Sequence, residues 1–137
     1  MKFTSIIAAL AVAGANAERA FTQIRLDDLQ ANKGYLELKA ETDVKVTVFE
    51  NESTPYWWQI TKNTCGNRFV LTKTTYHEKN TAALGAPGRH EWDFATPDAT
   101  TDYVKDVPCL VEFEMVKPDE EHTKKASYDK QLTVVVG

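Results

Sequence analysis

The chain has 137 residues, with 16 Lys and Arg against 20 Asp and Glu, and a net charge of −4 at pH 7. This length fits a single domain. The acidic balance and the lack of any Lys/Arg run argue against a nucleic-acid partner, which needs a basic surface, and no second apolar run is present to attach the domain to a membrane.

Residues 1–17 have the pattern of a secretory signal peptide. Lys2 gives a positive start, an apolar run covers residues 6–13, and Ala15-Asn16-Ala17 has the small-x-small form of a signal peptidase site. The run is shorter than the roughly 20 apolar residues that cross a bilayer. We therefore expect secretion to the extracellular space or an endomembrane lumen, cleavage after Ala17, and one domain over residues 18–137. Loss of these 17 residues, Lys2 among them, changes the net charge from −4 to −5.

The rest of the chain is a series of predicted short strands. They are rich in β-branched and aromatic residues, several alternate with period two, and turn residues separate them. They cover residues 35–39, 44–48, 56–60, 69–73, 91–94, 110–115 and 132–136, with 24–26 as a candidate eighth. Seven or eight such strands predict an all-β fold, an immunoglobulin-like antiparallel β-sandwich.

Two segments between these strands are predicted to form other structures, a short helical turn and a long loop. Residues 27–33 could form a turn or two of helix, which Gly34 would end, and no window has a helical apolar stripe. Residues 117–130 are polar and are expected to form a long exposed hairpin loop.

The chain has two cysteines, Cys65 and Cys109. In a secreted protein an even pair favours one disulfide. The rival interpretation is a pair of thiols, one of them a nucleophile, which needs a base and a polarising neighbour. Neither sequence context suggests such activation, so we predict the disulfide.

No catalytic or metal-binding constellation is evident in the sequence. His77, His90 and His122 fall in three different predicted loops, and none has a second ligand at zinc spacing. No serine lies in a Gly-x-Ser-x-Gly elbow, and the glycines form no phosphate-binding loop. We expect no enzyme activity, no metal and no cofactor.

Three loops are unusual for simple connectors. The first, residues 51–58, is a polar turn that leads into an aromatic cluster; the second, residues 84–88, is small and rigid; the third begins at Lys117-Pro118. They follow alternate strands, so they are expected at one end of the sandwich, where loops commonly bind partners. Trp57 and Trp58 should point to opposite faces of their strand, with at least one at the loop end.

With these loops the sequence resembles the chagasin family, secreted or lysosomal inhibitors of papain-like cysteine proteases. That family carries an Asn-Pro-Thr-Thr-Gly-aromatic loop, a Gly-x-Gly-Gly loop and an Arg-Pro-Trp loop on an immunoglobulin-like sandwich. The corresponding segments here are Asn51-Glu52-Ser53-Thr54-Pro55-Tyr56 with Trp58 after it, Gly85-Ala86-Pro87-Gly88, and Lys117-Pro118-Asp119.

The resemblance implies that the first loop enters the protease cleft while the other two brace against its walls, so the partner is a papain-like cysteine protease. Occlusion of this kind needs stiff loops, because ordering a loop on binding costs affinity. Pro55 stands where the family keeps glycine, Asp119 where it keeps tryptophan, and Lys117 where it keeps arginine. These departures predict weakened or altered specificity.

Asn51-Glu52-Ser53 is also an N-glycosylation sequon, and a glycan there would obstruct a loop that enters a cleft. Asn51 is therefore expected to be unmodified if the inhibitor hypothesis holds. The alternative is a non-inhibitory extracellular binding module for carbohydrate or protein, in which exposed tryptophans stack on sugar rings. A purely structural surface protein stays open, a hydrolytic enzyme is the least favoured class, and a monomer is expected.

Overall fold

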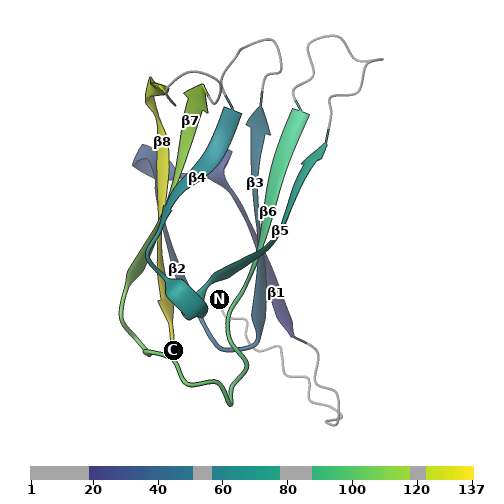
Figure 1. Cartoon of the computed structure of the whole chain (residues 1–137), viewed down its shortest axis with the longest axis vertical. Helices are drawn as coiled ribbons and strands as arrows, with labels where there is room; N and C mark the ends of the chain where they lie inside the picture. Colours follow the sequence, from purple (N-terminus) through teal and green to yellow (C-terminus); the bar gives the residue numbers. More distant parts are fainter. Residues whose placement is uncertain (1–18, 51–56, 78–87, 118–122) are drawn as a thin grey trace.

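The protein is a sandwich of two four-stranded sheets in the computed structural model, which describes residues 19–50, 57–77, 88–117 and 123–137, without the side chains of residues 50, 117 and 123–128 (Figure 1). One sheet, here called sheet A, has the order β1-β3-β6-β5, and the other, sheet B, has the order β2-β8-β7-β4. The bounds are β1 Ala20–Arg25, β2 Lys33–Leu38, β3 Thr42–Glu50, β4 Trp57–Asn63, β5 Val70–His77, β6 Gly88–Ala95, β7 Cys109–Lys117 and β8 Thr123–Val136. The predicted immunoglobulin-like sandwich is confirmed, with eight strands.

The two N-terminal strands join the sandwich in parallel, which an alternating pattern cannot reveal. β1 pairs with β3 and β2 pairs with β8, both in parallel register, whereas all other pairs are antiparallel. Between them the chain changes sheets through two single 3₁₀ turns, η2 (Leu26–Asp28) and η3 (Gln30–Asn32). These turns take the place of the helical turns expected there, and fully buried Leu26 anchors the crossing in the core.

The core lies between the sheets and follows the alternation in the sequence. In β3 the side chains of Val44, Val46 and Val48 are at most 1% exposed, and each alternates with a residue on the outer face. Phe69 and Phe94 stack at 4.2 Å between ring centroids. Burial of such side chains contributes roughly 1.5–3 kcal/mol each, so this apolar layer is the main source of stability.

Two expectations about local structure are wrong. The segment 117–130 is not one long loop, because β8 already begins at Thr123 and pairs with β7 from Lys117↔Thr123 onward. The second correction concerns the histidines, of which His77 ends β5 and His90 lies within β6. His122 lies outside the described residues.

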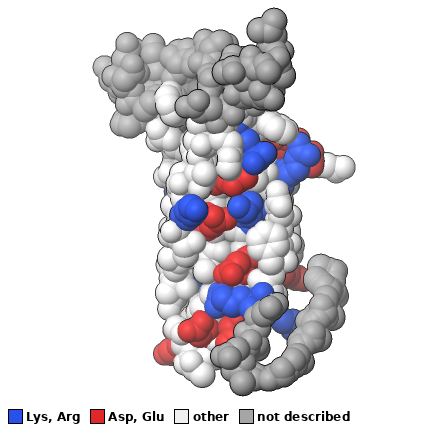
Figure 2. Space-filling model, turned by 90° about the vertical axis from the view of Figure 1, so that its right-hand side faces the viewer, with Lys and Arg blue, Asp and Glu red and all other residues white. Residues whose placement is uncertain are grey.

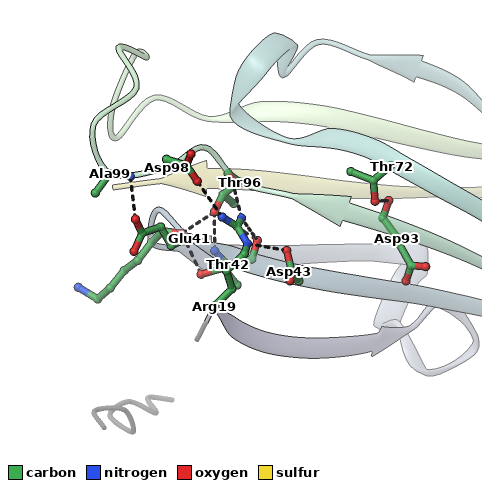
Figure 3. A network of polar contacts seen from close by, with 10 residues as sticks. Arg19, Glu41, Thr42, Asp43, Thr72, Asp93, Thr96, Asp98 and Ala99 are labelled. Atoms are coloured by element: carbon green, nitrogen blue, oxygen red, sulfur yellow. Dashed lines mark hydrogen bonds and ion pairs between the residues drawn. The ribbon is translucent and has the colours of Figure 1, made fainter. Parts of the chain in front are cut away.

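One end of the sandwich, here called the distal pole, is tied together by a disulfide and by an arginine. The predicted Cys65–Cys109 bridge is confirmed; it links the chain just after β4 to the first residue of β7. Arg19 donates hydrogen bonds to the Asp43 and Asp98 carboxylates at 2.9 and 3.1 Å and to the Thr96 carbonyl at 2.6 Å (Figure 3). These contacts join the start of β1 to β3, through Asp43, and to the chain that follows β6, through Thr96 and Asp98.

Within the described ranges, no helix is long and apolar enough to cross a membrane.

Candidate functional site

The strand ends that carry the three unusual segments gather at the end of the sandwich opposite the distal pole (Figure 1). In sheet A, Glu50 at the end of β3 pairs with Gly88 at the start of β6. In sheet B, Lys117 at the end of β7 pairs with Thr123 at the start of β8. We call this end, defined by residues 50, 57, 77, 88, 117 and 123, the loop-bearing pole.

The two sheets also meet at this pole through side chains. Trp57, the first residue of β4, contacts Tyr76 of β5 across the sandwich, with ring centroids 6.5 Å apart and ring planes inclined by 44°. Trp57 in turn pairs with Val116 of β7. Segments that leave β3, β5 and β7 therefore start from one compact base rather than from separate parts of the molecule.

Most of the predicted contact residues lie outside the described part of the chain. This applies to Asn51, Glu52, Ser53, Thr54, Pro55, Tyr56, Gly85, Ala86, Pro87, Pro118 and Asp119. Their contacts stay predictions, as does the state of the Asn51 sequon. Lys117 is the last residue of β7 and is therefore a strand residue by its backbone.

Two further predicted contact residues have different surroundings from those expected. Trp58 is only 4% exposed and belongs to the core, where it pairs with Met115, so its side chain supports the pole from inside. Gly88 is buried in β6 instead of lying in a loop. Of the two adjacent tryptophans, Trp57 is the exposed one, with 50% of its surface accessible. This agrees with the expectation that the two side chains point to opposite faces of the strand.

A charged cluster covers the outer face of sheet A. Glu91 of β6 accepts hydrogen bonds from Lys45 at 3.2 Å and Arg89 at 2.8 Å, and its carboxylate lies 3.2 Å from His77 Nε2. Burial raises the pKa of Glu91, but the hydrogen bonds from Lys45, His77 and Arg89 outweigh it and lower the pKa from 4.5 to about 2. Basic and acidic side chains alternate on this side of the molecule (Figure 2).

A hollow of about 400 Å³ adjoins this cluster and is lined by charges of both signs, including Arg25, Asp27, Lys45, Arg89 and Glu91. Three basic and two acidic side chains line the hollow, and Lys45 and Arg89 both pair with Glu91, which leaves only a small positive excess with which to attract an ionic ligand. Among the described residues, no group of three or more His, Cys, Asp or Glu side chains could hold a metal ion. The cluster is best explained as a stabilising ion-pair network.

The fold and the loop-bearing pole together define an eight-stranded immunoglobulin-like sandwich that presents three inter-strand segments at one end. The family model described as "Chagasin family peptidase inhibitor I42" matches residues 37–134, most of the chain. The protein therefore belongs to the chagasin family of cysteine protease inhibitors, which are inhibitors and not enzymes. No curated protein matches the chain significantly.

Solved structures agree on the fold. The crystal structure of the cysteine protease inhibitor EhICP2 from Entamoeba histolytica has a TM-score of 0.64 and 16% identity, over 87% of this chain and 97% of that one. The solution structure of Amebosin has a TM-score of 0.57 and 12% identity, over 85% and 98% of the two chains. PbICP-C, solved in complex with falcipain-2, has a TM-score of 0.56 and 13% identity, over 85% and 99%. At these identities the likeness extends to the fold alone.

Proposed function

We propose that the protein is a secreted inhibitor that occludes the active-site cleft of papain-like cysteine proteases with the three segments of the loop-bearing pole. The observation that carries this proposal is the gathering of the six strand ends at that pole, because a cleft can receive three segments together only if they start from one end of the sandwich. Membership of a family of cysteine protease inhibitors supports the partner class, and PbICP-C is a structural neighbour whose own complex is with such a partner, falcipain-2.

The mechanism needs no covalent step. A rigid base lets the segments bind without a large loss of conformational freedom, and the paired strand ends supply that base. Thr54 would offer a hydroxyl to the polar groups of the protease site while Tyr56 packs beside it. Secretion is supported by the signal peptide pattern over residues 1–17 and by the disulfide, a bond that persists in oxidising compartments.

The test is a titration of papain and several related enzymes with the processed protein, read as the loss of hydrolysis of a fluorogenic peptide. We expect inhibition, and we expect the double variant Thr54→Ala/Tyr56→Ala to lose potency by about 30-fold or more, as anchor residues do. The matched control is Phe21→Ala, an exposed aromatic at the opposite end of β1 from the loop-bearing pole. Absence of any inhibition at micromolar protein would refute the proposal.

Two companion measurements address its other parts. Mass analysis of the secreted protein should find an N-terminus at Glu18 and an unmodified Asn51, since a full glycan at that site would prevent insertion.

The carbohydrate-binding alternative has one observation in its favour, the exposed indole of Trp57. Clear hits on a glycan array, together with no protease inhibition, would favour that alternative.

A further inference from the structure

Trp57 is unusual among the three tryptophans of the chain. Its side chain is 50% exposed, whereas Trp58 and Trp92 are 4% and 2% exposed. It is the first residue of β4, at the loop-bearing pole, and its neighbour on the strand points into the core. A half-exposed indole at the end of a sandwich contributes less to stability than a buried one, and its exposed half is available to a partner.

The indole is held by a series of rings that leads into the core. Trp57 contacts Tyr76 at 6.5 Å, and Tyr76 meets the edge of His90 at 6.0 Å and 76°. His90 stacks on buried Trp92 at 4.3 Å and 14°. Contacts on one side of Trp57 limit its rotamers while the other side stays accessible. A partner that covers it therefore has little side-chain entropy to remove.

Gly88 makes room for this arrangement. A Cβ atom at Gly88 would overlap the Tyr76 hydroxyl and lie 2.6 Å from Tyr76 Cζ and 3.0 Å from the His77 carbonyl oxygen. The tyrosine ring thus occupies the space that any other residue at position 88 would take. The absence of a side chain at Gly88 leaves room for the Tyr76 ring, and that ring contacts Trp57.

We propose that Trp57 is a direct contact residue that packs against an apolar wall of the target protease's cleft, with Tyr76 and Gly88 as positioning residues. The inference rests on the proposed function and adds to it a residue that was not among the predicted contact residues. Tryptophan is the side chain most enriched among the residues that dominate interface energetics, and such residues lie in preorganised surroundings. An apolar wall is the surface that an indole covers at the least cost in desolvation.

The first experiment measures inhibition constants against the most tightly bound papain-like enzyme found for the wild-type protein. Trp57→Ala should weaken inhibition by about 30-fold, and Trp57→Phe, which keeps an aromatic ring, by only a few-fold. The control Phe21→Ala removes an aromatic of similar exposure, 62%, from the far end of sheet A and should leave the constant unchanged. Equal inhibition by Trp57→Ala and wild type would overturn the inference.

A second measurement observes the contact directly and does not need the alanine variant to fold. Protein labelled with 5-fluorotryptophan should give three ¹⁹F resonances, of which one, missing in Trp57→Phe, has a large H₂O/D₂O solvent shift. Addition of unlabelled protease should move that resonance most and remove its solvent shift, because the indole leaves water. Retention of the full solvent shift in the saturated complex would show that Trp57 is not covered, and the inference would fail.

The positioning roles have their own test. Tyr76→Ala and Gly88→Ala should each weaken inhibition by about three- to ten-fold and shift the free-state Trp57 resonance. Tyr76→Phe, which keeps the ring, should leave both the inhibition constant and the resonance close to those of the wild type. A purely structural role of Tyr76 would lower the melting temperature without moving that resonance, and this result would remove the positioning part of the inference.

The two proposals fail in different ways. If the wild-type protein inhibits no papain-like enzyme, the proposed function fails and the inference fails with it. If wild type inhibits, and Thr54→Ala/Tyr56→Ala is weakened while Trp57→Ala is not, only the inference fails. If Trp57→Ala leaves inhibition intact but abolishes binding to glycans on an array, the exposed indole serves a carbohydrate ligand and not a protease wall.

Discussion

Glu91 is the acidic centre of the ion-pair network on sheet A, and Glu91→Gln tests how much that network stabilises the fold. The carboxylate is 10% exposed and has three basic partners, Lys45, His77 and Arg89, which are 29%, 47% and 44% exposed. Glutamine keeps the size of the side chain and one acceptor oxygen but removes the charge. The variant should fold to the same structure with a lower free energy of unfolding.

The magnitude follows from the pKa of Glu91, which falls from 4.5 to about 2 in the folded protein. At about 1.36 kcal/mol per pKa unit, this difference sets an upper limit of roughly 3 kcal/mol. Solvent around the partly exposed partners screens the ion pairs, so we expect about 1–2 kcal/mol at pH 7. Because the folded-state pKa is the lower one, this contribution is complete above pH 4.5 and disappears as the pH falls toward 2.

The assay is urea unfolding of wild type and Glu91→Gln at several pH values between 7 and 2. The difference between the two proteins should be constant near neutral pH and shrink below pH 4.5. Glu37→Gln serves as the matched control, because Glu37 is an exposed carboxylate that contacts only the Tyr35 hydroxyl among the hydrogen bonds of the described residues. A difference that does not change with pH, or no difference at pH 7, would refute the electrostatic reasoning.

Three further predictions concern stability. Replacement of Cys65 and Cys109 by alanine removes a bridge between residues 44 positions apart and should lower the free energy of unfolding by about 4 kcal/mol on the chain-entropy model, measured by chemical denaturation. Arg19→Ala should lower the free energy of unfolding by about 1–2 kcal/mol and raise the rate of amide exchange at the start of β1, because the guanidinium donates hydrogen bonds to Asp43 and to the Thr96 carbonyl. Gly34→Ala places a Cβ atom 2.7 Å from Leu132 Cδ2 and should cost about 1–3 kcal/mol in a thermal melt.

The strands that could be predicted from the sequence are those with one buried and one exposed face. Residues 44–48 alternate, and their valines face the core as the pattern requires. The disulfide was predictable because the expected secretory compartment and the count of two cysteines together favour a single bridge. Strand direction was not predictable, because alternation is the same in a parallel and an antiparallel neighbour, as β1 and β2 illustrate.

The N-terminal half of β8 could not be found because backbone pairing, not apolar alternation, forms it. Its first residues pair with the end of β7 across an irregularity between Glu114 and Val116. The cluster around Tyr76 was missed for a similar reason, since Tyr76, Trp57 and Gly88 come from three different strands. One signal was present in the sequence: of two adjacent tryptophans in a strand, only one can enter the core.

The proposed binding residues lie at the opposite end of the sandwich from the disulfide and the Arg19 contacts, and the independence of the two ends can be tested. The disulfide and the Arg19 bonds lie at the distal pole, and Trp57, Tyr76 and Gly88 lie at the loop-bearing pole. Mutations at distant sites with no shared partners have nearly independent effects. Arg19→Ala should therefore lower the melting temperature but leave the inhibition constant unchanged at 25 °C, where the variant stays folded.

Trp57→Ala should show the reverse, with a small change in melting temperature and a large change in potency. A plot of melting temperature against inhibition constant for Arg19→Ala, Trp57→Ala and Phe21→Ala would show whether the effects on stability and on potency are independent. If potency instead follows stability across all three, the loop-bearing pole does not act as an independent binding surface. The whole sandwich would then have to be treated as one unit in explaining how the protein binds.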